Sequence, residues 1–339
     1  MGDPAGIGPE ITIRALSDPA IYSACRPIVI GDADVLEQVM PIVSDGSLVI
    51  HKAADVSDAL FQYGVIDIID IGAVDCSTLQ PGRVSAQAGE AAYLYIEKAI
   101  QLAQSGIVDA TVTNPINKEA LNLAGRHYAG HTEIYADLTN TKNVTMLLAH
   151  GPLRVVHVST HVSLRRACDL VKKERILDVI RIADDACRRL GIDSPRIAVA
   201  GLNPHSGENG LFGTEEAEEI IPAIEAAREE GISAEGPVPP DTVFSKAQGG
   251  MYDIVVAMYH DQGHIPLKLA GFKLDEKTGR WTNISGVNIT LGLPIIRTSV
   301  DHGTAFDQAW KGTASPMSLI EAINYAIRLA NVKNGGRRQ

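Results

Sequence analysis

The stretch Arg196-Ile-Ala-Val-Ala-Gly-Leu-Asn-Pro-His205 decides the fold, because it is a short apolar run that ends in a histidine. Two other runs, Leu153-Arg-Val-Val-His-Val-Ser-Thr-His161 and Tyr252-Asp-Ile-Val-Val-Ala-Met-Tyr-His260, have the same form. Runs rich in valine, isoleucine and alanine, without strict alternation, are typical of buried parallel strands. The sequence therefore predicts three parallel strands that belong to one sheet.

The histidines that end these runs are His161, His205 and His260. In open α/β sheets, ligands bind outside the carboxyl ends of the strands, so the three imidazoles are expected at one edge. Imidazole is a common ligand of divalent metals, and a catalytic metal has about three protein ligands with positions left for substrate. The spacings of 44 and 55 residues exclude a local zinc finger. We therefore predict a metal site, although each histidine alone also fits a hydrogen-bonded loop residue.

The composition is that of a soluble globular protein. Its 339 residues are 45% hydrophobic and 21% charged, which is enough for about two domains. The net charge is −11 and no basic run is present, so we expect no nucleic-acid partner. The sequence has no apolar segment of membrane-spanning length, no signal peptide and no C-x-x-C pair among its four cysteines. These features predict a cytoplasmic protein with reduced thiols and no membrane contact.

Strand-like and helix-like segments alternate along the chain, which predicts an α/β fold. The further strands that we expect are Pro27–Gly31, Leu48–His51, Ile66–Ile71, Asp109–Thr113, Val144–Ala149 and Val287–Leu291. The clearest helices are expected at Ala86–Gln104, Lys173–Leu190, Glu215–Glu230 and Pro316–Asn331. Breaks near 125–130 and 271–286 indicate that the chain leaves one domain, builds another and returns, with a ligand cleft between them.

The chain opens with a Gly-rich turn, Met1-Gly-Asp-Pro-Ala-Gly-Ile-Gly-Pro-Glu10, of the kind that joins a strand to a helix. No strand precedes the turn, which suggests that a few residues were lost from the sequence. The dinucleotide motif G-x-G-x-x-G is absent, and so are a P-loop and a G-x-S-x-G elbow. The sequence thus disfavours a Rossmann domain, a P-loop kinase and an α/β-hydrolase.

Two loops are candidates for ligand binding. The segment Gly130-His131-Thr132-Glu133 lies at a predicted helix start, where backbone N–H groups, a hydroxyl and an imidazole suit a phosphate. The alternative is an ordinary N-cap by Thr132. The segment Asn203-Pro-His-Ser-Gly-Glu-Asn-Gly210 is polar and Gly-rich, which favours a ligand loop over a simple turn.

Several charged and polar residues are further candidates for catalysis or substrate binding. Asp241 and Asp261 are candidates to orient the histidines or to accept a proton, and helix capping is the alternative for both. Lys268, Asn288 and Arg297 follow the third histidine. Alone, each of these three reads as a surface residue, but lysine and arginine also bind phosphate or carboxylate through charge-assisted hydrogen bonds.

Together these motifs closely resemble the 4-hydroxythreonine-4-phosphate dehydrogenase family. The segments that carry the resemblance are Gly2–Glu10, Gly130–Glu133, Asn203–Glu208, Pro240–Thr242, Met258–Gly263 and Gly286–Thr304. The family has the isocitrate/isopropylmalate dehydrogenase-like fold, with two α/β/α domains and the active site in the cleft. It works as a homodimer with the site at the interface, and both subunits contribute to the metal centre. We accordingly expect a first domain of residues 1–128 with 285–339 and a second of residues 129–284.

The resemblance also implies roles for individual residues. It implies that one divalent ion, zinc, cobalt, magnesium or manganese, is bound by His161, His205 and His260. The substrate contacts that it implies are His131, Thr132, Lys268, Asn288 and Arg297. The cofactor is expected to be NAD or NADP, bound without the Rossmann motif, and its residues stay unassigned.

The expected substrate is a small 4-phosphorylated hydroxy acid of four carbons. Oxidation of its C3 hydroxyl gives a β-keto acid that loses CO2, and Asp241, Asp261 and Lys268 are the candidates for the base. The segment Phe272–Ser285 is longer than in the vitamin B6 members and looks like the paralogous branch that acts on 4-phospho-D-threonate and 4-phospho-D-erythronate. We therefore expect 4-phospho-D-threonate, which gives dihydroxyacetone phosphate, ahead of 4-hydroxy-L-threonine 4-phosphate. The alternatives are a phosphate acyltransferase of related fold and a non-catalytic sensor of a phosphorylated acid.

Overall fold

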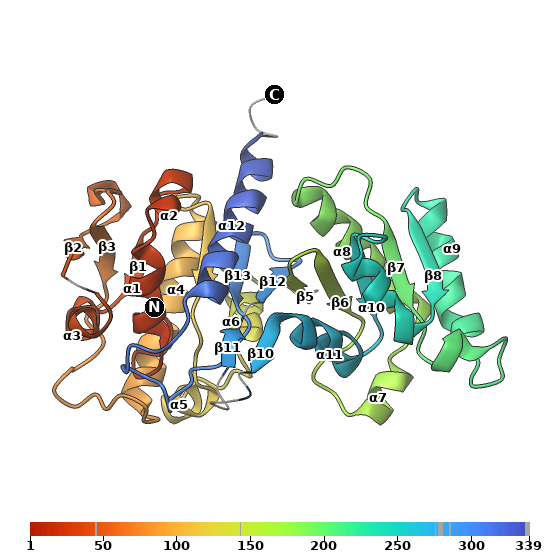
Figure 1. Cartoon of the computed structure of the whole chain (residues 1–339), viewed down its shortest axis with the longest axis horizontal. Coiled ribbons are helices and arrows are strands. Elements are labelled where there is room, and N and C mark those ends of the chain that lie inside the picture. Colours follow the sequence, from red (N-terminus) through yellow and green to blue (C-terminus); the bar gives the residue numbers. More distant parts are fainter. Residues whose placement is uncertain (45, 143, 275, 277–280, 285, 336–339) are drawn as a thin grey trace. The chain divides into compact units, whose positions relative to one another are not determined.

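The computed structural model describes residues 1–44, 46–142, 144–274, 276, 281–284 and 286–335 (Figure 1). The chain forms two compact units, unit 1 with residues 1–144 and 293–330, and unit 2 with residues 145–292 and 331–339. The expected domains divided instead after residues 128 and 284. The first boundary lies after residue 144 rather than residue 128, because the helix that begins at His131 belongs to unit 1. Its Ile134 and Tyr135 pack against Tyr93 and Ile96.

Unit 1 is built around short parallel strands with helices packed on them. Strand β3 pairs in parallel with β1 on one side and β2 on the other, and β13 pairs in parallel with β4. Its strands are β1 (Val29–Gly31), β2 (Val49–Ala53), β3 (Val65–Asp70), β4 (Ala110–Thr113) and β13 (Ile296–Val300). Its helices are α1 (Gly8–Leu16), α2 (Pro19–Ala24), α3 (Ala33–Val43), α4 (Ala86–Gln104), α5 (Lys118–Leu123), α6 (His131–Leu138) and, for most of its length, α12 (Met317–Gly335).

Unit 2 contains the three histidine-ended runs. Its sheet has the order β12-β5-β6-β9-β7-β8, in which β6, β9, β7 and β8 are parallel and β5 is antiparallel to β6 and β12. These strands are β5 (Thr145–His150), β6 (Leu153–His157), β7 (Ile197–Ala200), β8 (Ala234–Val238), β9 (Ile254–Ala257) and β12 (Val287–Leu291). The helices are α7 (Leu164–Asp169), α8 (Lys173–Arg189), α9 (Ile221–Glu229), α10 (Pro240–Gln248) and α11 (His260–Gly271).

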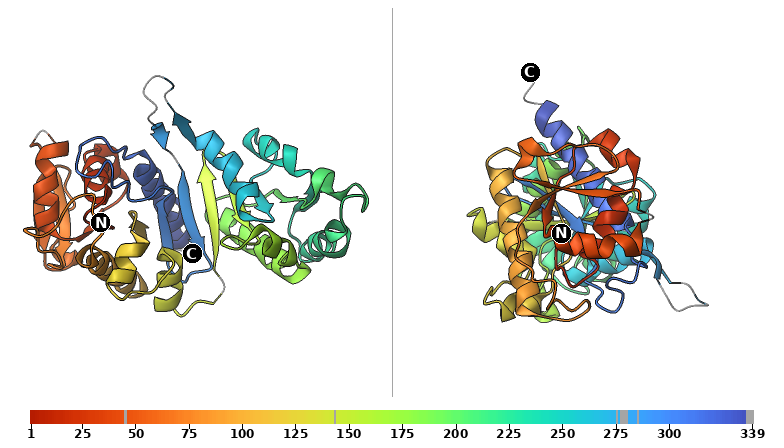
Figure 2. Two further views of the ribbon diagram at one scale, coloured as in Figure 1. Left: turned by 90° about the horizontal axis from the view of Figure 1, so that it is seen from below. Right: turned by 90° about the vertical axis from the view of Figure 1, so that its left-hand side faces the viewer.

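The core of unit 2 explains why these runs are strands. Residues of β6, β7 and β9 are buried, and α8 packs on one face of the sheet while α10 and α11 pack on the other (Figure 2, left). A strand that is covered on both faces needs apolar side chains on both, which the runs supply. The prediction of neighbouring parallel strands is therefore confirmed. Strand β8 lies at the edge of this sheet, where its Pro237 removes no interior hydrogen bond.

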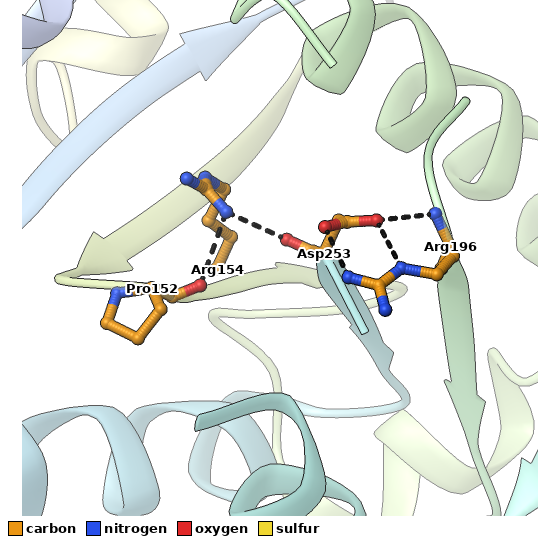
Figure 3. Close-up of polar contacts among 4 residues, drawn as sticks. All are labelled: Pro152, Arg154, Arg196 and Asp253. Atoms are coloured by element: carbon orange, nitrogen blue, oxygen red, sulfur yellow. Dashed lines mark hydrogen bonds and ion pairs between the residues drawn. The ribbon is translucent and has the colours of Figure 1, made fainter. Parts of the chain in front are cut away.

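The starts of the three strands are joined by charged side chains (Figure 3). Arg196, just before β7, forms a bidentate ion pair with Asp253, just before β9. Arg154 of β6 donates to the carbonyls of Asp253 and Pro152. The strands are thus fixed relative to one another at their amino ends, and the histidines follow at their carboxyl ends.

The segment Phe272–Ser285 contains an antiparallel pair, β10 (Phe272–Leu274) and β11 (Trp281–Ile284) (Figure 2). Residues 275, 277–280 and 285 of the segment lie outside the described residues. Within the described part of the chain, none of the helices is both long enough and apolar enough to cross a membrane.

Candidate functional site

The first cluster of candidate residues lies in unit 1, around Arg297. This residue is on β13 opposite Thr111 of β4, and its side chain is only 3% exposed, so it is not the surface residue that its sequence context suggested. Its Nε and Nη2 atoms donate to Oγ1 of Thr113, at 3.2 and 2.8 Å. The guanidinium lies 5.5 Å from the ring centroid of Tyr135, whose hydroxyl donates to Thr111. Burial lowers the pKa of Arg297 to about 10, so it remains a cation at neutral pH.

His131 is the second member of this cluster, because it begins α6. The N-cap residue is Gly130, which has no side chain to cap the helix, and Thr132 lies inside the first turn. The alternative that Thr132 is the N-cap is therefore wrong. Backbone N–H groups of a first turn lack partners within their helix and favour an anion. The Nε2 atom of His131 is buried without a hydrogen-bond partner in the described part of the chain. Burial and then the charge of Arg297 hold the pKa of His131 well below its usual value.

We call Arg297, His131, Thr132 and the start of α6 the anion group. A buried cation beside an N–H-rich helix start and an unsatisfied imidazole is suited to a phosphate. His131 and Arg297 were expected in different domains, but both belong to unit 1.

The second cluster lies in unit 2, beyond the carboxyl ends of β6, β9 and β7. The rings of His161 and His260 have centroids 5.9 Å apart. His205 lies in a short 3₁₀ turn, Pro204–Gly207, that follows β7. Among the described residues, no group of three histidine, cysteine or acidic side chains is placed to hold a metal ion. The structure therefore brings two of the predicted ligands together and does not bring His205 into one group with them.

Asp261 is a direct partner of His260. Its carboxylate lies 2.6 Å from Nδ1 of His260, while the N-cap residue of α11 is Tyr259. A carboxylate that accepts from Nδ1 fixes the ring tautomer and leaves Nε2 as the atom for a ligand. This geometry favours the orienting role for Asp261 over helix capping.

His264 and His157 are buried neighbours of this cluster that were not predicted from the sequence. His264 is four residues after His260 on α11, its ring stacks on that of His260 at 3.6 Å, and its Nδ1 donates to the His260 carbonyl. Burial lowers the pKa of His264 to about 4 and that of His157 to about 3, so both rings are neutral at neutral pH. The spacing of four residues on a helix was the available signal for His264. A Cβ on Gly263 would lie 2.3 Å from Nε2 of His157, so only glycine allows this packing.

Gln262 connects two of the histidine-bearing segments, and it too was missed. Its Oε1 accepts from the backbone N–H of Met258 at 2.7 Å, and its Nε2 donates to the carbonyl of Gly201 at 2.8 Å. Met258 follows β9 and Gly201 follows β7. The buried amide therefore sets the separation of the segments that carry His260 and His205.

The remaining candidates are spread over unit 2. Lys268 lies on α11, two turns after His260, with its Nζ 4.7 Å from the ring centroid of Phe272. Asn288 lies on β12 opposite Leu148, and its Nδ2 is 2.7 Å from Sδ of Met146. Asp241 is exposed in the first turn of α10, the helix that packs against the 3₁₀ turn of His205.

Comparison with known proteins gives the class. The model of the family described as pyridoxal phosphate biosynthetic protein PdxA matches residues 23–326. The chain is 49% identical over 330 residues to a D-threonate 4-phosphate dehydrogenase of Pectobacterium atrosepticum, which covers 97% of this chain and 98% of that protein. It is similar to the crystal structure of 4-hydroxythreonine-4-phosphate dehydrogenase from Klebsiella pneumoniae, with a TM-score of 0.84, 47% identity and coverage of 97% and 98%. A terephthalate 1,2-cis-dihydrodioldehydrogenase from Burkholderia xenovorans is 31% identical, with a TM-score of 0.65 and 96% coverage of each chain.

The fold and these matches define the chain as an α/β dehydrogenase, an oxidoreductase that acts on a CH–OH group. It belongs to the pyridoxal phosphate biosynthetic protein PdxA family. The family and the fold class expected from the sequence are confirmed, and the acyltransferase alternative is set aside. A dehydrogenase of this kind requires a nicotinamide cofactor.

Proposed function

We propose that this enzyme oxidises the C3 hydroxyl of 4-phospho-D-threonate with NAD or NADP and releases CO2 and dihydroxyacetone phosphate. The observation that carries the proposal is the anion group, in which the buried Arg297 of β13 lies over Tyr135 of α6 and His131 begins that helix. The choice of a threonate is supported by two relatives, from Pectobacterium atrosepticum and Salmonella typhimurium, which are each 49% identical to this chain and are named D-threonate 4-phosphate dehydrogenase.

The anion group binds the phosphate of the substrate. The guanidinium of Arg297 supplies the fixed positive charge, and the backbone N–H groups at the start of α6 supply directed donors. Thr132 adds a hydroxyl, and the neutral His131 presents an unsatisfied ring nitrogen. Because these groups do not take part in the reaction at C3, their main contribution is to bind and orient the substrate.

His161, His205 and His260 bind one divalent metal, with zinc and cobalt favoured by the imidazole donors over magnesium and manganese. The fit is supported by the neighbouring rings of His161 and His260 and by the carboxylate of Asp261 at the second ring nitrogen of His260. When bound, such a metal supplies a Lewis acid that lowers the pKa of a substrate hydroxyl.

The other residues of unit 2 handle the acid end of the substrate and the proton of the C3 hydroxyl. Because Asp261 is occupied by His260, the candidates that remain for the base are Lys268 and Asp241. Asn288 contributes an amide at the carboxyl side of the substrate. The β10–β11 pair, which starts four residues after Lys268, is the segment that we propose selects a hydroxyl rather than an amino group at C2.

We also propose that the enzyme is a cytoplasmic homodimer whose metal centre uses residues of both subunits. The support is that the three histidines do not form one group among the described residues of a single chain. In addition, the apolar side chains of Ile265 and Leu269, one turn apart on α11, are 63% and 81% exposed. Such a pair is expected at a subunit interface.

The experiment is an assay of NADH and NADPH formation by the Co²⁺-loaded enzyme. 4-Phospho-D-threonate and 4-hydroxy-L-threonine 4-phosphate are compared at equal concentration. We expect faster turnover of the threonate, with dihydroxyacetone phosphate as product. A preference for the amino acid would overturn the substrate assignment, and saturable binding of both acids without turnover would identify a sensor.

A further inference from the structure

The turn that carries His205 has an unusual backbone. The φ angles of His205, Ser206, Glu208 and Asn209 are 53°, 57°, 42° and 56°, and Gly207 between them has a φ of 80°. These angles lie in the left-handed region, which residues other than glycine rarely adopt. Such a conformation persists only where the surrounding structure determines it. Some neighbouring group must therefore stabilise the turn.

The buried carboxylate of Glu216 contacts both the turn and the residues that lead into it. Its Oε1 accepts hydrogen bonds from the backbone N–H groups of Leu202 and Asn203, both at 2.8 Å. Its Oε2 accepts from Nδ2 of Asn203 at 2.9 Å. Glu216 itself is only 4% exposed. Oε2 also lies against Gly207, where an added Cβ would be only 2.8 Å away. One carboxylate therefore contacts both sides of His205 along the chain.

The local helix explains how Glu216 reaches this position. Glu216 begins a π-helical segment, Glu216–Ile220, that leads into α9. A π-helical turn contains an extra residue, and such turns are frequent at functional sites. Just before the two residues whose backbone N–H groups Glu216 accepts, Nε2 of Gln262 donates to the carbonyl of Gly201. The segment from Gly201 to Gly207 is thus held by Gln262 at its start and by Glu216 along its length.

From these contacts we infer that Glu216 is a positioning residue for His205, an inference that rests on the proposed metal centre. Glu216 does not bind the metal in this scheme. Its carboxylate accepts the backbone N–H groups of Leu202 and Asn203, which lead into the turn, and lies against Gly207 within it. These contacts on both sides of His205 hold the left-handed conformation that presents its imidazole. Loss of the carboxylate should leave the imidazole in the chain but misplaced.

Glu219 offers a matched control in the same π-helical segment. Its carboxylate accepts from Nζ of Lys172 and from the backbone N–H of Lys173, so it contacts the start of α8. Glu219→Gln therefore removes the same charge from the same segment without touching the turn of His205.

The test is titration of the metal-free full-length protein with Co²⁺, followed by the visible absorption of the bound ion. We expect Glu216→Gln to weaken Co²⁺ binding by about 10- to 100-fold and to change the absorption spectrum. Glu219→Gln should bind Co²⁺ like the wild type. Asn203→Ala, a milder change that leaves both backbone bonds to Glu216, should give an intermediate loss and keeps the test open if Glu216→Gln does not fold. Hydrogen exchange at the Leu202 and Asn203 amides should become faster in Glu216→Gln only.

The outcomes separate the inference from the proposed function. Co²⁺ binding and spectra of Glu216→Gln equal to those of Glu219→Gln would overturn the role of Glu216. If the wild type bound no Co²⁺, the metal centre itself would be wrong and no ligand would remain to be positioned, so the inference would fall with it. Amide exchange would then report only whether Glu216 stabilises the turn.

Discussion

The carboxylate of Asp253 accepts hydrogen bonds from Nε and Nη2 of Arg196, both at 3.0 Å, and a third from the Arg196 backbone N–H at 2.8 Å (Figure 3). The two residues precede β9 and β7, and the carbonyl of Asp253 also accepts from Arg154 of β6. The pair therefore fixes the register of the strands whose other ends lead to the histidines.

Replacing Asp253 with Asn should lower the free energy of unfolding by about 1–2 kcal/mol, because a bidentate charge-assisted pair is lost. Arg196 lowers the pKa of Asp253, so the contribution is present above the ordinary carboxyl pKa and is lost as the pH falls through the lowered value. Denaturant unfolding at pH 7 and pH 3 checks both points. Asp178→Asn, at an exposed pair with Arg181, is the control and should have almost no effect.

Arg297→Lys should reduce kcat/KM about 10- to 100-fold, mainly through a higher KM, because lysine cannot reproduce the planar fork in the anion group. Steady-state kinetics with the phosphorylated substrate measure the change. The matched control is Arg126→Lys, which alters a bidentate pair with Glu90 on α4. If the two variants had equal kcat/KM, the proposal that Arg297 binds the phosphate would be wrong.

His205→Ala should abolish turnover and weaken Co²⁺ binding, because one of three proposed imidazole ligands is removed. Calorimetric titration with Co²⁺ and the NAD(P)H assay test the two effects separately. His127→Ala, at an exposed residue that contacts Asn122, controls for loss of a histidine. Full activity of His205→Ala at trace metal would refute the assignment.

Asp3→Asn should stabilise the protein at neutral pH. The side chain is fully buried, its Oδ1 accepts from the Ala5 N–H at 2.8 Å, and burial raises its pKa to about 6. The folded state thus prefers the protonated acid, so stability is full below the ordinary carboxyl pKa and falls as the pH rises through 6. The gain of the variant should reach up to about 3 kcal/mol at pH 8 and disappear near pH 3. Melting temperatures across this range measure it, and a gain that does not change with pH would contradict the explanation.

Leu269→Glu should shift the protein from dimer to monomer, because a carboxylate cannot be buried in an apolar interface without a partner. Light scattering after size exclusion gives the mass directly. Leu123→Glu, at a 59% exposed leucine on α5, is the control and should leave the mass unchanged. An unchanged dimer in Leu269→Glu would place the interface elsewhere.

Much of the sheet in unit 2 could be predicted from the sequence, because a strand covered on both faces must be apolar throughout. The order of the strands could not be predicted. Strand β9 lies between β6 and β7 although it follows both in the sequence, and short apolar runs carry no record of their neighbours. Strand β13 was missed for a different reason. Its sequence, Ile-Arg-Thr-Ser-Val, reads as exposed, yet Arg297 and Thr298 are buried.

For the candidate site, residue type and position at strand ends were enough to select the histidines. The partners of these histidines were only partly visible. Asp261 adjoins His260 in the sequence, so its role could be anticipated. Glu216 lies 11 residues after His205, and its contacts depend on a π-helical turn that could not be predicted from a local sequence motif. Buried polar residues that act through the backbone have no sequence pattern of their own.

The two parts of unit 1, residues 1–144 and 293–330, are synthesised at different times. Thr113 of β4 leaves the ribosome 184 residues before its partner Arg297 of β13. All of residues 145–292 are made in that interval, and domains generally fold as units while the chain grows. Unit 2, with the three histidines that we propose as metal ligands, can therefore fold before β13 is available to pair with β4. Arg297, the residue that we propose binds the phosphate, enters its buried position only after that pairing forms.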